Sequence, residues 1–354
     1  MLIAIAFLVA LFFAMNIGGS GAAASMGIAY GSGAVKHKYV ALTLCALGIF
    51  LGAAIGSKEV IKTIGSGLIP TSLLSLELVI VILASACTTL FIANILGIPL
   101  STSEVTVGSI VGVGIAYQSV YFYNLIFIVI WWIITPVIAF IFSFFVGRWV
   151  ERKKTRLEQL LHRHHHLFIV FVIGTGFLEA FSAGMNNAAN TIGPLVGAGA
   201  ISVQQGMILG GAFVALGVLV LGTRTIETNG KKITSLSLIQ GVSVSGTSAV
   251  IVIVASLFGI PVPMTQITTT GILGIGASTQ GMNIFQRHMI KKIFAIWIVS
   301  PLLALTIAYT VVQLMIENNL YASLAILSVL FSTIGIVALL KIVKSERDLK
   351  QRRI

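Results

Sequence analysis

The sequence has very little charge and almost no aspartate. Only 9% of its 354 residues are charged, 57% are hydrophobic, and aspartate occurs once, at Asp348. The mean hydropathy is +1.05. A soluble domain of this length needs far more charge to cover its surface, so the composition excludes one. Apolar runs of about 20 residues, each long enough to cross a bilayer as a helix, recur along the chain. The sequence therefore predicts an all-α polytopic membrane protein.

Cysteine is also scarce, and it does not occur in a metal-binding or disulfide pattern. Cys45 and Cys87 lie inside apolar segments, which is typical of buried, reduced thiols. A histidine tract, His162 and His164–His166, lies in a basic segment without cysteine or aspartate. We interpret this tract as a strip facing solvent or lipid headgroups. We expect no metal and no cofactor.

Basic residues gather in two places, and the start of the chain has none. One cluster covers Arg148–Arg156 and the other Lys341–Arg353, whereas the first 35 residues carry no charge. The positive-inside rule places both clusters in the cytoplasm and lets the N-terminus lie outside. The expected location is the plasma membrane. Because these charges flank membrane spans, the partner that they predict is anionic lipid and not nucleic acid.

The chain contains an internal repeat. Four pairs of segments match in the same order: Gly18–Gly27 with Gly184–Gly193, Gly31–Val35 with Gly197–Ile201, Gly97–Glu104 with Gly259–Gln266, and Gly108–Gly114 with Thr270–Gly276. Repeat and charge together predict a first transmembrane repeat over 1–147, a basic cytoplasmic linker over 148–165, an inverted second repeat over 166–317, and a last transmembrane helix with a basic tail over 318–354. Inverted repeats are typical of secondary transporters.

Apolar helices and glycine-rich stretches alternate within each repeat. We expect helices over 2–18, 39–56, 73–96, 120–147, 166–183, 206–223, 235–258, 290–316 and 322–343. Between them, the stretches 18–35, 97–119, 184–200 and 259–282 are apolar but rich in Gly, Ser and Thr. Such stretches at matching positions predict broken or re-entrant helices that form the substrate site.

Helix ends within these stretches suit a small anion, because freed backbone N–H groups and the helix dipole attract negative charge. The candidate binding residues are Gly19, Ser20, Ser25, Ser101, Thr102, Ser103, Asn186, Asn187, Asn190, Thr191, Thr265 and Gln266. For any single hydroxyl a purely structural role is favoured over anion binding, since Ser and Thr often pack membrane helices or bond their own backbone. For the three asparagines we favour a function, because unpaired amides are costly in lipid.

These segments resemble the duplicated signature of the inorganic phosphate transporter family, which is about Gly-Ala-Asn-Asp-x-Ala-Asn in each half. Asn186, Asn187 and Asn190 match the second signature, and Ser20 and Gly21 stand in the first. In that family a Pro-x-Ser-Thr-Thr-His segment follows each signature. The resemblance covers nearly the whole chain and implies an oxyanion carrier.

The departures from the family pattern favour a different anion. The family's aspartates are Gly21 and Asn187 here, and its histidines are Glu104 and Gln266. This pattern is similar to the sulfate permease branch of the family. Phosphate keeps a proton near neutral pH and is well served by a carboxylate acceptor, whereas sulfate only accepts hydrogen bonds. We therefore predict a secondary transporter that imports sulfate or a related oxyanion, with an inorganic phosphate transporter as the alternative.

The same departures bear on the coupling ion. Loss of both aspartates removes oxygen ligands for sodium, so proton coupling or a facilitated route is favoured over sodium coupling. Intramembrane carboxylic acids are the usual proton carriers, and Glu104 and Glu179 lie within apolar runs. The alternative for each glutamate is a purely structural role, as a hydrogen-bond partner of a neighbouring helix. The sequence leaves monomer and homodimer both open.

A rival from another class is a rhomboid-like intramembrane serine protease. Gly18–Gly21 resembles its Gly-x-Ser-Gly segment, with Ser20 as the nucleophile. That chemistry needs a histidine base at the same depth. His37 and His288 lie beside basic residues at span ends, so we expect no enzyme. A channel or a structural scaffold is the other alternative, and saturable uptake would distinguish a carrier from either.

Overall fold

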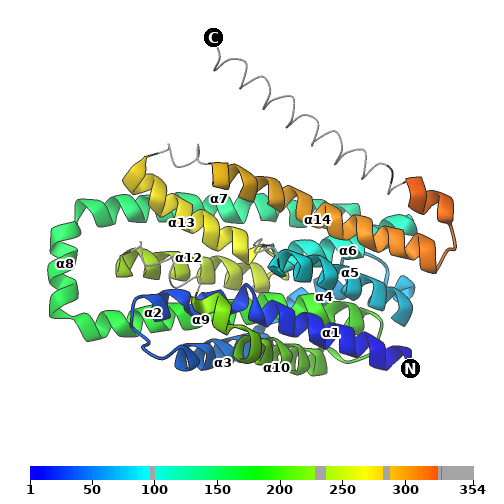
Figure 1. Cartoon of the computed structure of the whole chain (residues 1–354), viewed down its shortest axis with the longest axis horizontal. Helices are drawn as coiled ribbons and strands as arrows, with labels where there is room; N and C mark the ends of the chain where they lie inside the picture. Colours follow the sequence, from blue (N-terminus) through cyan, green and yellow to red (C-terminus); the bar gives the residue numbers. More distant parts are fainter. Residues whose placement is uncertain (96–99, 228–236, 282–287, 326–327, 329–354) are drawn as a thin grey trace, which may run out of the picture.

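The computed structural model describes residues 1–95, 100–227, 237–281, 288–325 and 328, and within them every regular element is a helix (Figure 1). In chain order the elements are α1 (Leu2–Gly19), η1 (Ala22–Met26), α2 (Gly27–Gly31), α3 (Lys38–Gly56), α4 (Lys58–Ser66), η2 (Thr71–Leu73), α5 (Leu76–Ile95), α6 (Thr102–Ala116), α7 (Phe122–Arg152), α8 (Lys154–Arg163), α9 (His165–Gly197), α10 (Val203–Leu221), α12 (Leu238–Leu257), α13 (Met264–Gln280) and α14 (His288–Met315).

Eight helices among the described residues are long and apolar enough to cross a membrane. They cover Leu2–Gly31, Lys38–Gly56, Leu76–Ile95, Phe122–Arg152, His165–Gly197, Val203–Leu221, Leu238–Leu257 and Trp297–Met315. Large apolar side chains such as Ile133 and Phe145 on α7 are exposed, as expected where a helix faces lipid. The all-α polytopic fold is confirmed, and the chain is a multi-pass membrane protein. The helix expected over 322–343 lies, apart from residues 322–325 and 328, outside the described residues, as does Asp348.

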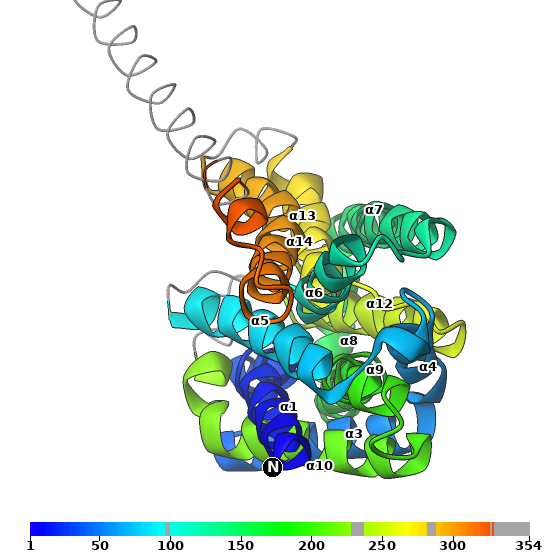
Figure 2. The ribbon, with the colours of Figure 1, turned by 90° about the vertical axis from the view of Figure 1, so that its right-hand side faces the viewer.

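The two halves contact each other through two matching sets of helix pairs, so that each contact made by a helix of the first half is repeated by the corresponding helix of the second half. α1 packs against α10 and α3 against α9, while α6 packs against α14 and α13 against α7 (Figure 2). Each of these contacts joins one half to the other. α1 and α9 begin at opposite ends of the bundle (Figure 1), as an inverted second repeat requires. The inversion itself stays a prediction.

The first glycine-rich stretch breaks a helix, as expected. α1 ends at Gly19, a short 3₁₀ turn covers Ala22–Met26, and α2 begins at Gly27. The Gly19 carbonyl, released from the helix, accepts a hydrogen bond of 2.6 Å from the hydroxyl of Thr225. The break therefore has a partner that satisfies its freed backbone group.

The matching stretch in the second half is not broken, and our expectation for 184–200 was wrong. α9 continues without interruption from His165 to Gly197. Its glycines serve close packing: a Cβ atom at Gly184 would overlap the carbonyl of Ile49, and one at Gly197 would overlap the carbonyl of Gly65. Glycine thus lets α9 approach α3 and α4 closely, a use that membrane helices share with helix breaks.

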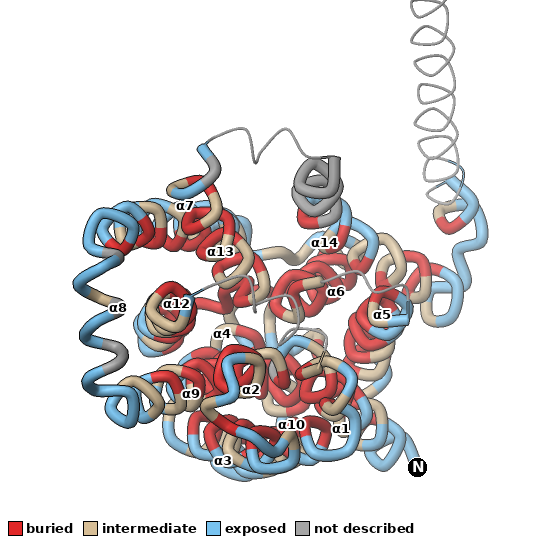
Figure 3. The backbone as a smooth tube through the Cα atoms, turned by 60° about the vertical axis from the view of Figure 1, so that its left-hand side comes forward, coloured by how far each residue is buried: buried red, intermediate tan, exposed pale blue. Residues whose placement is uncertain are grey.

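The middle of the bundle is formed by α6, α13 and the second half of α9. These segments are largely buried, whereas α8 is exposed along most of its length (Figure 3). α8 joins α7 to α9 at the end of the bundle opposite the N-terminus (Figure 1). The segment expected as a linker over 148–165 therefore consists of the last turn of α7 followed by this helix.

Candidate functional site

The site begins at the N-terminus of α6. Ser101 is the N-cap residue, with an extended backbone, and its hydroxyl accepts a 3.4 Å hydrogen bond from the backbone N–H of Glu104. A capping serine satisfies one of the free N–H groups of the first turn. Thr102 and Ser103 are the first two residues of the helix, so their side chains lie where the dipole is most positive.

Three asparagines of α9 face this first turn. Thr102 donates a 2.7 Å hydrogen bond to Asn187, and Ser103 donates a 3.0 Å hydrogen bond to Asn186. The amide nitrogen of Asn190 lies 3.3 Å from the Thr102 hydroxyl and 3.2 Å from that of Ser103. The structure therefore brings together five of the predicted residues, two from the first repeat and three from the second. We call these five residues the amide–hydroxyl cluster.

Asn186 anchors the cluster to the chain break before α13. Its amide nitrogen donates 3.2 Å hydrogen bonds to the Ser256 hydroxyl and to the carbonyl of Ile260. The carbonyl of Ile260 is available because α12 ends at Leu257 and α13 begins only at Met264. The predicted interruption at 259–282 thus exists at its start, and one asparagine side chain satisfies a backbone group there.

The first turn of α13 lies next to the start of α6 and to the break in α1. Thr265 donates a 3.3 Å hydrogen bond to the carbonyl of Leu100, just before α6. A Cβ atom at Gly21 would lie 3.6 Å from the Thr265 hydroxyl oxygen. The N-termini of α6 and α13 and the broken segment after α1 therefore meet in one region. Thr102, Thr265 and Ser20 are partly exposed there, whereas Asn187 is only 5% exposed.

Glu104 lies in the first turn of α6 but does not face the asparagines. Its carboxylate accepts a hydrogen bond from the amide of Gln266 on α13 and one of 3.0 Å from the hydroxyl of Ser300 on α14. The side chain is 2% exposed. The structure therefore brings Glu104, predicted for coupling, into contact with Gln266, predicted for anion binding, and the hydrogen bonds that Glu104 accepts come from α13 and α14 and not from the cluster.

Glu179 is a second buried carboxyl, and it has hydroxyl neighbours. Thr268 of α13 donates a 3.1 Å hydrogen bond to its carboxylate, and Thr268 lies 3.0 Å from the hydroxyl of Ser248 on α12. Glu179 thus lies between α9, α12 and α13 and not at the amide–hydroxyl cluster itself.

A cavity of ≈ 690 Å³ lies beside Glu104. Glu104, Gln266 and Thr270 provide its polar lining, and the rest is apolar side chains of α6, α7, α13 and α14. Since this cavity is almost entirely apolar, it does not suit a small dianion. The anion candidates are the polar groups on the other side of the α6 turn.

Some predicted residues have other roles in this structure. The hydroxyl of Thr191 donates a 2.9 Å hydrogen bond to Ala188 within α9, and that of Ser20 donates a 3.2 Å bond to Ile17 within α1. Gly19 contributes its carbonyl to Thr225, as described above. Ser25 is buried and its hydroxyl has no partner among the described residues, which leaves a donor available.

Sequence reasoning missed the residues that hold the site in place. Ser256 supports Asn186, Ser300 supports Glu104, and Thr225 supports the end of α1. Ser256 lies three residues before the Gly259 break and Ser300 directly precedes a proline inside a span. Both are polar residues in an apolar span beside a Gly or Pro, although α14 continues through Pro301, and that combination is the signal that could have indicated them.

The chain matches known transporters. The model of a family described as "Phosphate transporter family" matches residues 17–308. The sulfate permease CysP of Bacillus subtilis (strain 168) is 49% identical over 347 residues, which cover 97% of this chain and 96% of that protein. A solved structure described as the sodium-dependent phosphate transporter has a TM-score of 0.72 at 23% identity and covers 89% of this chain and 100% of that one. At that identity the structural likeness supports the fold alone.

Proposed function

Because the chain belongs to the phosphate transporter family, we propose that it is a secondary transporter that imports sulfate across the plasma membrane. The observation that carries this proposal is the neutral amide–hydroxyl cluster at the start of α6, with Asn187 where the family signature has aspartate. The 49% identity to a sulfate permease supports the same anion.

The chemistry of the cluster suits an anion that only accepts hydrogen bonds. The first turn of α6 offers free backbone N–H groups at the positive end of a helix dipole. Hydroxyls of Thr102 and Ser103 and the amides of the three asparagines add donors, and no aspartate occurs in the described residues. These groups bond one another in the structure, and a bound sulfate would replace internal bonds with charge-assisted ones.

Phosphate is the second candidate, and the site fits it less well. Its proton needs an acceptor, and a carboxylate is the strongest one that a protein offers. The two described carboxyls near the centre, Glu104 and Glu179, are occupied by Gln266, Ser300 and Thr268 on other faces of their helices. The acceptors that the cluster itself offers a phosphate proton are neutral amide and hydroxyl oxygens, including the side-chain oxygen of Asn190, which has no partner within the described part of the chain. They are weaker acceptors than a carboxylate, so the cluster suits sulfate better.

We propose that protons drive the uptake and that Glu104 and Glu179 are the carriers. Both carboxyls are buried between membrane helices and neither forms an ion pair with a described basic residue. Intramembrane carboxyls of this kind are typical members of the proton relays of transporters. Both bond to α13, whose first turn also lies at the anion side, so a change in protonation reaches the anion site through one helix.

The proposed orientation has the N-terminus outside and the C-terminus in the cytoplasm. α8 and the last turn of α7 carry the mid-chain basic cluster, and they lie at the end of the bundle opposite the N-terminus (Figure 1). The positive-inside rule places that end in the cytoplasm.

Uptake into proteoliposomes tests the proposal. The full chain is reconstituted, and uptake of radiolabelled sulfate and of radiolabelled phosphate is measured with an inward proton gradient, with a sodium gradient and with neither. The expected result is saturable sulfate uptake that the proton gradient accelerates and that sodium does not. Flux that rises linearly with sulfate concentration would indicate a channel, and preferred phosphate uptake would overturn the assigned substrate.

A further inference from the structure

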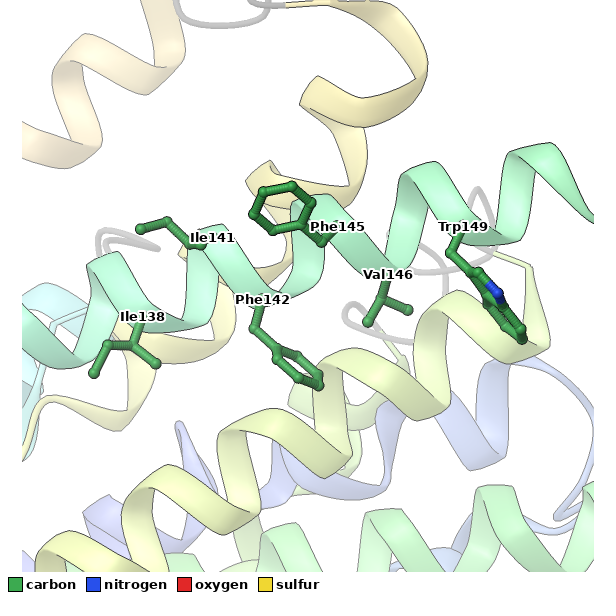
Figure 4. Close-up of a pocket in the computed structure, with 6 residues that line it drawn as sticks. All are labelled: Ile138, Ile141, Phe142, Phe145, Val146 and Trp149. Carbon is green, nitrogen blue, oxygen red and sulfur yellow. The ribbon is translucent and has the colours of Figure 1, made fainter.

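A shallow groove of ≈ 450 Å³ follows the outer surface of α7 near its C-terminal end. Six apolar residues line it: Ile138, Ile141, Phe142, Phe145, Val146 and Trp149. Phe145 is 66% exposed and Trp149 52% exposed. In Figure 4, Phe142, Val146 and Trp149 point from α7 towards the neighbouring α12. The groove is therefore an apolar surface on a membrane-spanning helix.

The groove has the length of one bilayer leaflet. Ile138 and Trp149 are eleven residues apart in the sequence, and a rise of 1.5 Å per residue gives about 17 Å between them. Half of a hydrocarbon core is about 15 Å. Trp149 ends the apolar stripe, at the position where tryptophan marks the boundary of the lipid headgroups.

Basic residues follow directly where the apolar stripe ends. The stripe repeats at intervals of three and four residues, and the same spacing after Trp149 reaches Arg152 and Lys153, with Arg148 one turn before Arg152. All three are exposed, and no described carboxylate forms an ion pair with any of them. Glu151 is an exposed acidic residue in the same turn, so the local charge remains positive.

α8 then turns away from α7 and runs across the end of the bundle (Figure 1). Leu157 is half-buried and Leu160 exposed, while Arg156 and Arg163 are exposed. A short amphipathic, basic helix perpendicular to the spans is typical of a helix in the headgroup plane. This second observation places the headgroup layer at the height of Arg152 and Lys153.

We propose that this groove is a binding site for an anionic phospholipid of the cytoplasmic leaflet. The acyl chain lies along the groove from Trp149 to Ile138, and Arg152 and Lys153, with Arg148, bind the phosphate and the net charge of the headgroup. Charge complementarity selects an anionic lipid over a zwitterionic one, whose positive group these residues repel. The site is distinct from the amide–hydroxyl cluster and does not depend on which anion is transported.

Photo-crosslinking of lipid to the full-length protein tests this site. The protein is reconstituted with phosphatidylglycerol or phosphatidylcholine at equal mole fraction, each carrying a diazirine in the same acyl chain, and adducts are mapped by mass spectrometry. Phosphatidylglycerol is expected to label residues 138–149 at least about fivefold more than phosphatidylcholine. The double variant Arg152→Gln, Lys153→Gln is expected to lower its yield most of the way to that of phosphatidylcholine, with Arg148 as the remaining basic residue.

Three controls distinguish a specific site for anionic lipid from other causes of preferential labelling. The variant Lys58→Gln, Lys62→Gln removes the same charge from α4 and should leave the labelling unchanged. Salt at about 1 M shortens the Debye length to about 3 Å and should remove the preference in the wild-type protein, independently of how any variant folds. Free sulfate or phosphate should not compete. Equal labelling by both lipids, a preference insensitive to salt, or crosslinks between two copies of the protein in place of lipid adducts would each overturn the proposal.

Discussion

Asn187→Asp is the substitution that tests the proposed anion site most directly. Asn187 is 5% exposed, and its side-chain oxygen accepts a 2.7 Å hydrogen bond from Thr102. A carboxylate has the same shape and can accept the same bond, so the variant keeps the geometry and changes the charge. It also restores the residue that the family signature has at this position.

The expected cost to sulfate follows from Coulomb's law. A dianion about 5 Å from a carboxylate, at an effective dielectric constant of about 20, is repelled by about 7 kcal/mol. The dipole of α6 offsets at most about 2 kcal/mol of that. The remaining 5 kcal/mol or so corresponds to a loss of more than a thousandfold in affinity. Sulfate uptake by the variant should therefore fall below detection.

Phosphate should respond differently. Monobasic phosphate carries half the charge of sulfate and a hydroxyl that donates to the new carboxylate, so repulsion falls and a charge-assisted hydrogen bond forms. The carboxylate is also an added oxygen ligand for sodium. The ratio of phosphate to sulfate uptake should rise by at least about a hundredfold, and sodium should begin to stimulate uptake.

The assay is competitive uptake into proteoliposomes with both labelled anions, with and without sodium. Asn124→Asp is the charge control, because Asn124 is exposed at the start of α7 and is not part of the cluster; the variant adds the same charge but loses the hydrogen bond that the Asn124 amide donates to the carbonyl of Gly67. Asn187→Ala separates the loss of the amide from the gain of charge. Sulfate affinity and selectivity unchanged in Asn187→Asp would refute the site assignment, whatever the control shows.

Three further predictions follow from single contacts. Thr102→Val removes a donor and should weaken sulfate affinity about tenfold or more in the same uptake assay, with unchanged uptake counting against a contact. Glu104→Gln keeps a hydrogen-bonding side chain but cannot release a proton, so sulfate uptake should fall and its pH dependence should flatten, with Glu179 left as the remaining carrier; an unaltered pH profile would exclude the proposed role of Glu104. Gly184→Ala should destabilise the protein by about 1–3 kcal/mol, seen as a lower thermal unfolding temperature in detergent, because the added Cβ overlaps the backbone of α3. Gly174→Ala is its control in the same helix, since nothing lies within 4 Å of that position.

Hydropathy was enough to predict the spans because each is a long, uniformly apolar helix whose outer face meets lipid. It was not enough to predict which glycines break a helix. Gly19 ends α1, whereas Gly184, at nearly the same place in the repeat, lies in the middle of α9. Close packing does not distinguish the two, because a Cβ atom at Gly18, which matches Gly184 in the repeat, would overlap the carbonyl of Val214 on α10, as one at Gly184 would overlap that of Ile49 on α3. The end of α1 has in addition Thr225, whose hydroxyl donates a hydrogen bond to the freed Gly19 carbonyl. A sequence without its contacts contains neither fact.

The asparagines could be identified from the sequence because an amide in an apolar run is costly whatever its partner. Individual hydroxyls could not be assigned, since the rotation of the helix decides their direction. Thr102 faces α9 and bonds Asn187, whereas Thr191 bonds its own helix at Ala188. The expectation that a single hydroxyl bonds its own helix therefore describes Thr191 but not Thr102. Ser300 was not predicted because it comes from a helix outside both signatures.

The position of the two carboxyls also has a consequence for coupling in the proposed transporter. Glu104 and Glu179 come from different halves, yet both bond to α13, through Gln266 and Thr268. Thr265, in the same turn, bonds the segment just before α6 and lies beside the break in α1. Protonation of either carboxyl would change a hydrogen bond to the start of α13. That part of α13 also contacts the anion side, through Thr265. In the proposed transporter, charge repulsion would keep acidic groups off the anion face, and their shared contact with α13 is the route by which we propose that they act on it.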